Sequence, residues 1–302
     1  MKLDFDVVII GAGVAGMTSA LYLKRSGIKC CIIEKYIPGG QINLSPSVEN
    51  YPGFINISGA DLALNLFEQV KRLDIPYFNE EVISINNIND YKNVVTKSRT
   101  ISAKKVIVAV GKKPRKLEAV GLNEMIGKGV SYCATCDGYL YKGRDVAVIG
   151  GSDSALEEAL YLSNICNKVT IIHRKDKFSA QQIYIDKISQ KTNIAIEFNS
   201  VVEKIINDGK KVSGVYIKVF DKGKEIFIDG CFICIGYEPN TSFLKNIVKL
   251  DKNGYIKVNK KYMTSIDGIY AIGDAIKKQQ FQLIFAMNDG ICVANECIKL
   301  LK

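Results

Sequence analysis

Two cysteines separated by two residues, Cys133 and Cys136, are the side chains of this sequence best suited to covalent chemistry. They lie in the run Tyr-Cys-Ala-Thr-Cys-Asp-Gly, which ends beside a turn. A Cys-x-x-Cys pair at the start of a helix has a lowered thiol pKa, which supplies the thiolate that attacks a disulfide. The spacing therefore predicts a redox-active dithiol. Asp137 follows directly and can act either as a helix cap or as the general acid that protonates a leaving thiolate.

A second pair with the same spacing, Cys231 and Cys234, opens the alternative of a zinc site built from both pairs. The run Cys-Phe-Ile-Cys-Ile is typical of a buried strand, where residues three apart point to opposite faces. We therefore interpret this second pair as core packing and expect no metal site. The remaining cysteines lie in apolar stretches and are interpreted as structural: Cys30, Cys31, Cys166, Cys292 and Cys297.

The elements that must position this chemistry begin with a glycine-rich turn that follows an apolar strand at 7–10 and opens an amphipathic helix at 14–25. In a dinucleotide-binding unit Gly11 allows the tight turn, Gly13 lets the backbone approach a pyrophosphate, and Gly16 lets the helix lie close to the strand. The helix N-terminus then offers unpaired N–H groups and a partial positive charge to the diphosphate.

The next strand ends in an acid, as this unit requires. Glu34 follows Gly11 by 23 residues and is expected to accept hydrogen bonds from the ribose hydroxyls of an adenosine. A turn that binds nothing is the alternative, but strand, helix and acid are all in place.

A second unit repeats this layout. A strand at 146–149 leads into Gly150, a helix follows, and the next strand ends at His173, again 23 residues later. Here the strand end is basic, with His173, Arg174 and Lys175 in succession, and such side chains can pair with a 2′-phosphate. The second unit is therefore expected to favour NADPH over NADH, with a solvated basic turn as the alternative.

Length and composition agree with two nucleotide-binding domains. The chain has 302 residues, 47% of them hydrophobic, which is enough for two sizeable cores. No signal peptide and no membrane-length apolar run occur, so we expect a soluble cytoplasmic protein without a membrane or nucleic-acid partner. Nine cysteines in that compartment indicate thiols rather than a disulfide scaffold. Two nucleotide sites that flank one dithiol describe a flavoprotein that moves electrons onto a disulfide.

From residue 6 to the C-terminal helix, the chain resembles the low-molecular-weight thioredoxin reductases of the bacterial type. Cys-Ala-Thr-Cys-Asp-Gly matches the dithiol segment of that family, and Gly-Gly-Gln at 39–41 and Glu-Asn-Tyr-Pro-Gly at 49–53 resemble its flavin-contacting segments. Gly-Asp-Ala at 273–275 corresponds to the segment whose Asp binds the flavin ribityl chain. The further FAD residues that this resemblance implies are Gly40, Gln41, Asn50, Gly273, Asp274 and Gln282.

The resemblance implies an α/β fold of two Rossmann-like three-layer domains, the second inserted into the first. Residues 1–115 and 244–302 would bind FAD, and residues 116–243 would bind NADPH and carry the dithiol. It also implies a homodimer that passes electrons from NADPH through FAD to thioredoxin, with Cys136 next to the flavin and Cys133 exchanging with the partner. Helices are expected at 62–73 and 284–301.

Several positions depart from the family pattern, and most of them concern the electron donor. Ser152 replaces the second glycine of the second turn. Lys175 stands for an Arg, the last Arg of the basic motif is Ser179, and Phe281 stands where Arg is usual. Lys177 could compensate for the missing Arg.

The net charge of +10 lies entirely in the predicted flavin domain, which holds 25 Lys and Arg against 15 Asp and Glu. The central segment is neutral, with 16 of each sign. Such a field would steer an acidic partner, either thioredoxin or ferredoxin, and a generally solvated basic surface is the alternative. The candidate steering patches are Lys112 with Lys113 and Lys277 with Lys278.

Two other hypotheses remain open at this point. In one, reduced ferredoxin replaces NADPH as the electron donor. In the other, the protein binds flavin as a sensor or interaction protein without turnover, which the intact dithiol and Asp137 disfavour.

Overall fold

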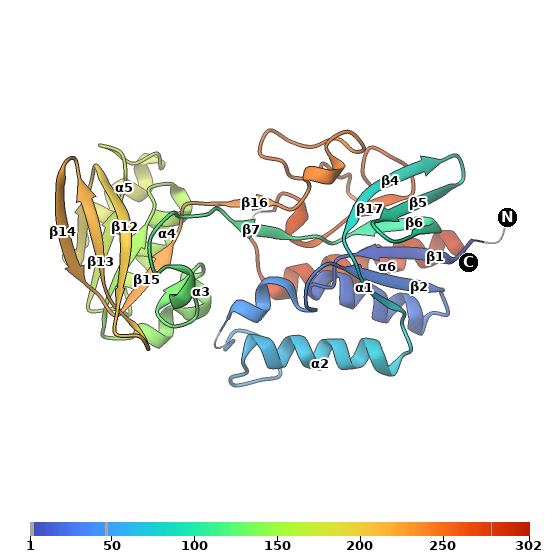
Figure 1. Cartoon of the computed structure of the whole chain (residues 1–302), viewed down its shortest axis with the longest axis horizontal. Coiled ribbons are helices and arrows are strands. Elements are labelled where there is room, and N and C mark those ends of the chain that lie inside the picture. Colours follow the sequence, from blue (N-terminus) through green and yellow to red (C-terminus); the bar gives the residue numbers. More distant parts are fainter. Residues whose placement is uncertain (1–2, 46–47, 279) are drawn as a thin grey trace. The chain divides into compact units, whose positions relative to one another are not determined.

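The computed structural model describes residues 3–45, 48–278 and 280–302 and divides into two compact units (Figure 1). Unit 1 comprises Met1–Asn43, Tyr51–Lys113 and Glu238–Lys302, and unit 2 comprises Leu44–Asn50 and Pro114–Tyr237. The two connecting segments, β7 (Lys112–Pro114) and β16 (Tyr237–Pro239), pair as a two-stranded sheet.

Unit 1 is built on a seven-stranded sheet in the order β3-β2-β1-β6-β5-β4, with β17 paired to β6. The pairs among β1, β2, β3, β6 and β17 are parallel, whereas β4 and β5 are antiparallel. The strands are β1 (Phe5–Ile10), β2 (Cys30–Glu34), β3 (Tyr77–Asn79), β4 (Val82–Ile88), β5 (Tyr91–Thr96), β6 (Thr100–Val108) and β17 (Ile269–Ala271).

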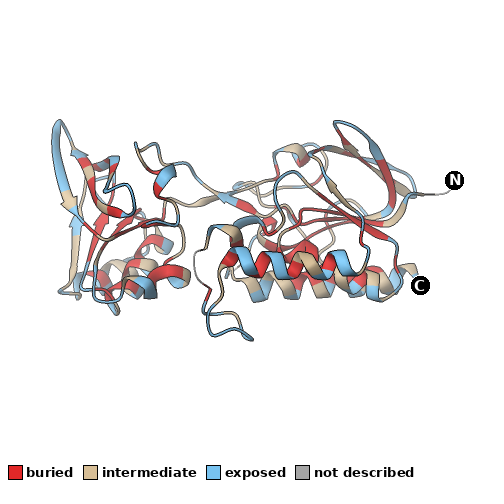
Figure 2. Ribbon diagram, turned by 60° about the horizontal axis from the view of Figure 1, so that its bottom comes forward, coloured by how far each residue is buried: buried red, intermediate tan, exposed pale blue. Residues whose placement is uncertain are grey.

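Three long helices of unit 1 lie on one side of this sheet (Figure 1): α1 (Val14–Arg25), α2 (Gly59–Arg72) and α6 (Leu283–Leu301). Helix α2 shows why these sequences fold as they do. Ser58 caps it by accepting the Asp61 N–H at 3.0 Å. Leu62, Leu66 and Val70 recur every four residues and are buried, which gives the striped pattern of helices in Figure 2. The two helices expected from sequence are thus confirmed as α2 and α6.

Unit 2 has three layers. A parallel sheet in the order β11-β10-β9-β15-β8 lies between helices and a three-stranded antiparallel sheet, β12-β13-β14. The strands are β8 (Val130–Ser131), β9 (Asp145–Ile149), β10 (Lys168–Ile172), β11 (Ile194–Glu197), β12 (Ser200–Asn207), β13 (Val212–Val219), β14 (Lys222–Phe227) and β15 (Gly230–Ile233). The helices are α3 (Ala134–Asp137), α4 (Asp153–Ser163) and α5 (Gln182–Ser189).

Short 3-10 turns complete the two units: η1 (Gly40–Leu44), η2 (Asn123–Met125), η3 (Gly138–Tyr141), η4 (Ser242–Leu244) and η5 (Gly273–Ala275). Across the described residues, no helix combines the length and apolar character that crossing a membrane requires.

The internal repeat read from the sequence is confirmed by matching contacts in the two units. The Gly11 N–H donates to the Ile33 carbonyl at 2.8 Å, and the Gly150 N–H donates to the Ile172 carbonyl at 3.0 Å. Each glycine therefore leaves its strand at the same point relative to the neighbouring parallel strand. Both turns open at the carboxyl edge of a parallel sheet, where nucleotides bind in open α/β folds.

Candidate functional site

The first glycine turn is closed by packing at two of its glycines and open at the third. A Cβ at Gly11, whose φ is +109°, would lie 2.3 Å from the Ala109 carbonyl oxygen, and one at Gly16 would lie 2.0 Å from the Gly11 carbonyl oxygen. At Gly13 a Cβ would meet nothing within 4 Å. Packing within the turn therefore requires a glycine at positions 11 and 16 but not at 13. The open space in front of Gly13 suits a diphosphate at the N-terminus of α1.

Glu34 is held at this turn by two backbone donors. Its Oε2 accepts the Ala12 N–H at 2.8 Å, and its Oε1 accepts the Tyr36 N–H at 2.9 Å. A carboxylate has about four acceptor positions, so both oxygens keep capacity for ribose hydroxyls. The side chain is fixed where the sequence expects an adenosine.

Segments distant in sequence converge on this turn. The Gly39 N–H donates to the Ala12 carbonyl at 2.8 Å, which places Gly40 next to Gly13. A Cβ at Gly273, with φ +66°, would lie 3.1 Å from the Ala15 Cβ. Unit 1 thus brings three segments of the implied FAD site together.

Asp274 is positioned by a buried network that sequence reasoning missed. Asp289 accepts the Gly273 N–H at 2.9 Å through Oδ2 and the Tyr262 hydroxyl at 2.9 Å through Oδ1, and it forms an ion pair with Lys278. Burial raises the pKa of Asp274, against the opposing effect of two nearby lysines. The local signal for Asp289 was an acidic residue in the mostly apolar first half of α6.

Three residues of the implied flavin set remain. Gln41 is exposed in η1, and its Nε2–H donates to the Lys112 carbonyl at 2.6 Å. Gln282 is the N-cap residue of α6 and is half-buried. Asn50 is exposed and belongs to unit 2.

The second turn has the same tight start but a different third position. A Cβ at Gly150 would lie 2.4 Å from the Cys234 carbonyl oxygen, so a glycine is required there. Ser152, at the position of Gly13, is the N-cap residue of α4 but makes no side-chain cap bond, and its Oγ lies 3.2 Å from the Ser154 Oγ. The serine therefore adds a hydroxyl at the helix start without closing the turn.

His173 occupies a buried position beneath this turn. Its ring atoms would lie 2.4–2.6 Å from a Cβ on Gly151, and its Nε2 is 3.1 Å from the Lys177 carbonyl. Burial lowers the pKa of His173. The imidazole shapes the turn as a neutral group and does not present a charge at the surface.

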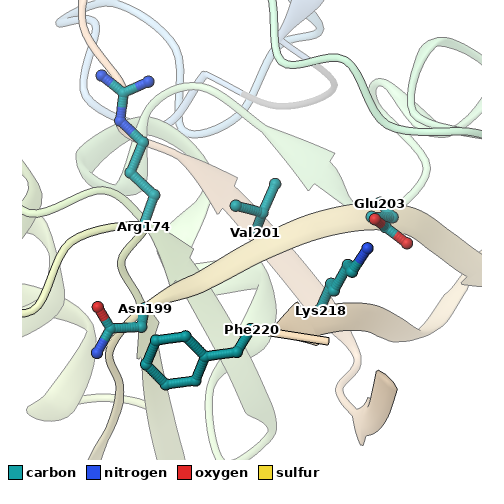
Figure 3. A pocket seen from close by; sticks show the side chains of 6 residues that line it. All are labelled: Arg174, Asn199, Val201, Glu203, Lys218 and Phe220. Carbon is teal, nitrogen blue, oxygen red and sulfur yellow. The ribbon is translucent and has the colours of Figure 1, made fainter. Parts of the chain in front are cut away.

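Arg174 and Lys175, by contrast, are exposed at the end of β10. The Arg174 side chain borders an open pocket of about 340 Å³, whose other lining residues are Asn199, Val201, Glu203, Lys218 and Phe220. Figure 3 shows the guanidinium pointing away from Phe220 at the rim of this pocket. Both cations are therefore at the surface, where an anionic group can reach them.

The dithiol lies at the start of the short helix α3. Cys133 and Cys136 form a disulfide, Cys133 is the N-cap residue, and both are half-buried. The pairing expected from the Cys-x-x-Cys spacing is confirmed.

Asp137 follows Cys136 directly in the chain, at the end of α3, and is buried, with 7% of its surface exposed. Its Oδ2 accepts the Ser131 hydroxyl at 2.7 Å, and its Oδ1 accepts the Ser45 hydroxyl at 3.1 Å. Burial raises the pKa of this carboxyl, which favours a protonated acid. The helix-cap interpretation of Asp137 is wrong, because its side chain makes no cap bond.

Glu158 is a second carboxylate beside the dithiol, and sequence reasoning missed it. Its Oε2 accepts the Ala134 N–H at 3.2 Å and the Cys234 thiol at 2.9 Å. Burial raises the pKa of Cys234, so this residue remains a thiol donor. Glu158 therefore ties the first residue of α3 to the strand end that closes the second glycine turn.

The Cys231 and Cys234 thiols pack on opposite faces of the sheet, as their spacing predicts. Cys231 belongs to the core shared with β12 and β13, and Cys234 to the core under α4. Within the described ranges, no three His, Cys, Asp or Glu side chains cluster as metal ligands do. Of the cysteines interpreted as structural, four are buried, but Cys292 is exposed on α6 because its position falls on the outer face of that helix.

The two lysine pairs considered as surface patches need a correction. Lys112 is buried and pairs with Asp274 at 3.5 Å, and the Lys278 side chain, 11% exposed, pairs with Asp289. Only Lys113 and Lys277 are exposed. Two of the four lysines proposed as steering patches are therefore paired with carboxylates inside unit 1.

Comparison with known proteins identifies relatives along nearly the whole chain. A family model described as pyridine nucleotide-disulphide oxidoreductase matches residues 5–290. The thioredoxin reductase of Listeria monocytogenes is 41% identical over 288 residues, covering 95% of this chain and 90% of that protein. The thioredoxin reductase of Bacillus subtilis is 38% identical over 292 residues, covering 96% and 92%.

Solved structures give the same result. The crystal structure of thioredoxin reductase from Streptococcus pyogenes superposes with a TM-score of 0.94 at 39% identity, covering 98% of each chain. Thioredoxin reductase from Giardia duodenalis superposes with a TM-score of 0.91 at 32% identity, also covering 98% of each chain. The Rossmann-like α/β architecture expected from the sequence is confirmed.

Proposed function

The chain belongs to the pyridine nucleotide-disulphide oxidoreductase family, and its relatives include thioredoxin reductases. From this premise we propose that it is an FAD-dependent thioredoxin-disulfide reductase that uses NADPH. The observation that carries the proposal is the Cys133–Cys136 disulfide, followed directly by the buried acid Asp137, in a chain that has two glycine turns of matching geometry. One dithiol and two nucleotide sites are the components that this reaction needs.

FAD is assigned to unit 1. The residues that would hold it are Gly11, Gly13, Gly16, Glu34, Gly40, Gln41, Asn50, Gly273, Asp274 and Gln282, of which Asn50 comes from the segment assigned to unit 2. The open face of Gly13 and the fixed carboxylate of Glu34 fit its diphosphate and ribose. When bound, FAD supplies the electron-transfer chemistry between nicotinamide and disulfide, while the chain binds and orients it.

The dithiol carries the electrons to the partner by thiol–disulfide exchange. In the reduced enzyme the Cys133 thiolate attacks one sulfur of the partner's disulfide, a mixed disulfide forms, and the other partner sulfur leaves as a thiolate. Protonated Asp137 gives its proton to this leaving thiolate. Cys136 then attacks Cys133, which re-forms the enzyme disulfide and releases the second partner thiolate. The partner gains two electrons, and the enzyme dithiol loses two.

NADPH is assigned to the glycine turn of unit 2, where Gly150 and Ser152 would bind its pyrophosphate and Arg174 and Lys175 its 2′-phosphate. His173 contributes through shape, because it is buried and neutral. The domain assignment is 1–115 and 244–302 for FAD and 116–243 for NADPH and the dithiol. Thioredoxin as partner, a homodimer and a cytoplasmic location complete the proposal.

Anaerobic mixing of the purified protein with NADPH tests the proposal. We expect rapid loss of flavin absorbance, followed by thioredoxin reduction. If NADPH does not bleach the flavin but reduced ferredoxin reduces it fully, ferredoxin is the electron donor in place of NADPH. The relatives do not favour this alternative. Reduction by neither donor would leave a flavin-binding protein without turnover.

Replacing Arg174 and Lys175 together by Ala should raise the Michaelis constant for NADPH much more than that for NADH. One charge-assisted contact contributes roughly 1.5–3 kcal/mol, which corresponds to about tenfold to a hundredfold in affinity. Steady-state kinetics with both nucleotides measure the effect. The matched control replaces Lys168 at the other end of β10 by Ala and should change neither constant. Equal loss with both nucleotides would show that the two residues do not read the 2′-phosphate.

The rate of thioredoxin reduction should fall with ionic strength if the positive charge of unit 1 steers an acidic partner. Screening lengths shorten from about 10 Å at 0.1 M salt to about 3 Å at 1 M salt. Charge reversal at the exposed lysines Lys113 and Lys277 should weaken this salt dependence, whereas an uncharged aromatic disulfide should show little of it. A rate constant for thioredoxin that does not change with salt would leave the charge without a steering role.

A further inference from the structure

Lys112 is a buried lysine at the centre of the residues assigned to FAD. Only 7% of its surface is exposed, whereas its neighbour Lys113 is exposed and pairs with Glu238 at 3.0 Å. Burying an ammonium group costs free energy unless charged or polar partners compensate, so a buried lysine needs a reason.

Three contacts fix Lys112 in place. Its Nζ lies 3.5 Å from the Asp274 Oδ2 and 3.2 Å from the centre of the Phe281 ring, and its carbonyl accepts the Gln41 Nε2–H at 2.6 Å. The ring face attracts the cation in addition to the carboxylate. Gln41 and Asp274 are residues assigned to FAD, and Phe281 precedes a third, Gln282. One lysine is therefore joined to three separate segments of the assigned flavin site.

The charge balance around Asp274 shows that this cation acts inside the site. Lys112 and Lys278 both lower the pKa of Asp274, while burial raises it. Lys278, however, is paired with Asp289, which accepts the Gly273 N–H. Lys112 thus pairs with Asp274, whereas Lys278 pairs with Asp289.

We propose that Lys112 is a flavin-site residue of this chain, whose buried ammonium strengthens FAD binding and favours the reduced cofactor. The proposal rests on the assignment of FAD to unit 1. Positive charge held in a site of low dielectric stabilises whichever state of a bound group is more negative. The reduced form of FAD is more electron-rich than the oxidised form, and Asp274, which pairs with Lys112, is itself assigned to FAD. Both the affinity for FAD and its potential therefore depend on this cation.

The test compares Lys112→Met, which removes the charge and keeps most of the side-chain volume, with Lys112→Arg and with the exposed control Lys113→Met. FAD is removed and returned to each apoprotein, and the dissociation constant is read from flavin fluorescence. The flavin midpoint potential is measured against a reference dye. These two readouts do not depend on catalytic turnover.

Lys112→Met should raise the FAD dissociation constant about tenfold or more and lower the midpoint potential, by about 30 mV for each tenfold change in a two-electron equilibrium. Lys112→Arg should retain most of both properties, and Lys113→Met should retain them fully. Unchanged affinity and potential in Lys112→Met would overturn the proposal. A wild-type protein that does not bind FAD would instead overturn the assigned cofactor.

A second pair of variants separates the charge of Lys112 from its support of Asp274. If the ammonium acts on the flavin itself, Lys112→Met should lower the potential by a similar amount in an Asp274→Asn background. If the decrease vanishes there, Lys112 acts only as the counter-ion of Asp274, and the proposed direct role is refuted. Should Lys112→Met not fold, Lys112→Gln gives the same comparison.

Discussion

Cys136→Ser and Cys133→Ser should each lower thioredoxin reduction by at least about a thousandfold, because removing a reacting nucleophile removes the covalent route itself. FAD should stay bound in both variants, since nearly all of its assigned residues lie in unit 1 and the disulfide lies in unit 2. Turnover with thioredoxin and the flavin absorbance spectrum measure the two effects separately.

Cys292→Ser is the matched control for these variants, because Cys292 is the exposed free thiol on α6. It should retain wild-type turnover. Wild-type turnover in either dithiol variant would remove the Cys133–Cys136 pair from the mechanism. Loss of flavin in both dithiol variants would show that FAD binding by unit 1 depends on the disulfide in unit 2.

Asp137→Asn should slow thioredoxin reduction by about 10²–10⁴-fold, the usual contribution of a positioned general acid. Burial raises the pKa of Asp137, so the carboxyl remains protonated at higher pH than an exposed aspartate. The wild-type rate should therefore fall as pH rises through this raised pKa, and the Asn variant should lack that decrease. The pH dependence of the rate measures both.

The stability of Asp137→Asn follows from the same shift. A carboxyl with a raised pKa in the folded state contributes stability below its unfolded pKa and loses it as pH rises through the folded pKa. Asn does not ionise and can still accept a hydrogen bond from Ser45 or Ser131, so the variant should be no less stable than wild type at neutral pH. Thermal unfolding at several pH values checks this.

Asp153→Asn is the control for Asp137→Asn. Asp153 is more exposed and accepts bonds from the Gln181 backbone and side chain, which lower its pKa. Its replacement should leave the pH profile of thioredoxin reduction unchanged. A wild-type profile in Asp137→Asn would refute the role of that residue as the acid.

The sequence by itself determined the features that depend on local spacing. Gly11 and Gly150 stand where a parallel strand turns into a helix, and the structure reproduces the same backbone bond in both units. The Cys133–Cys136 pair is close in sequence, so its disulfide needs little from the rest of the fold. Opposite faces for Cys231 and Cys234 follow from strand periodicity alone.

Only the tertiary structure decided which charged and polar groups are buried and with whom. Lys112 and Lys113 are adjacent in sequence, yet one pairs with Asp274 inside unit 1 and the other is exposed. The sequence predicts His173 to be a basic surface residue, but in the structure its ring packs against Gly151. These outcomes depend on contacts between segments that are distant in sequence. A buried charge needs a partner because leaving it unpaired costs free energy, and the fold determines which distant residue lies close enough to be that partner.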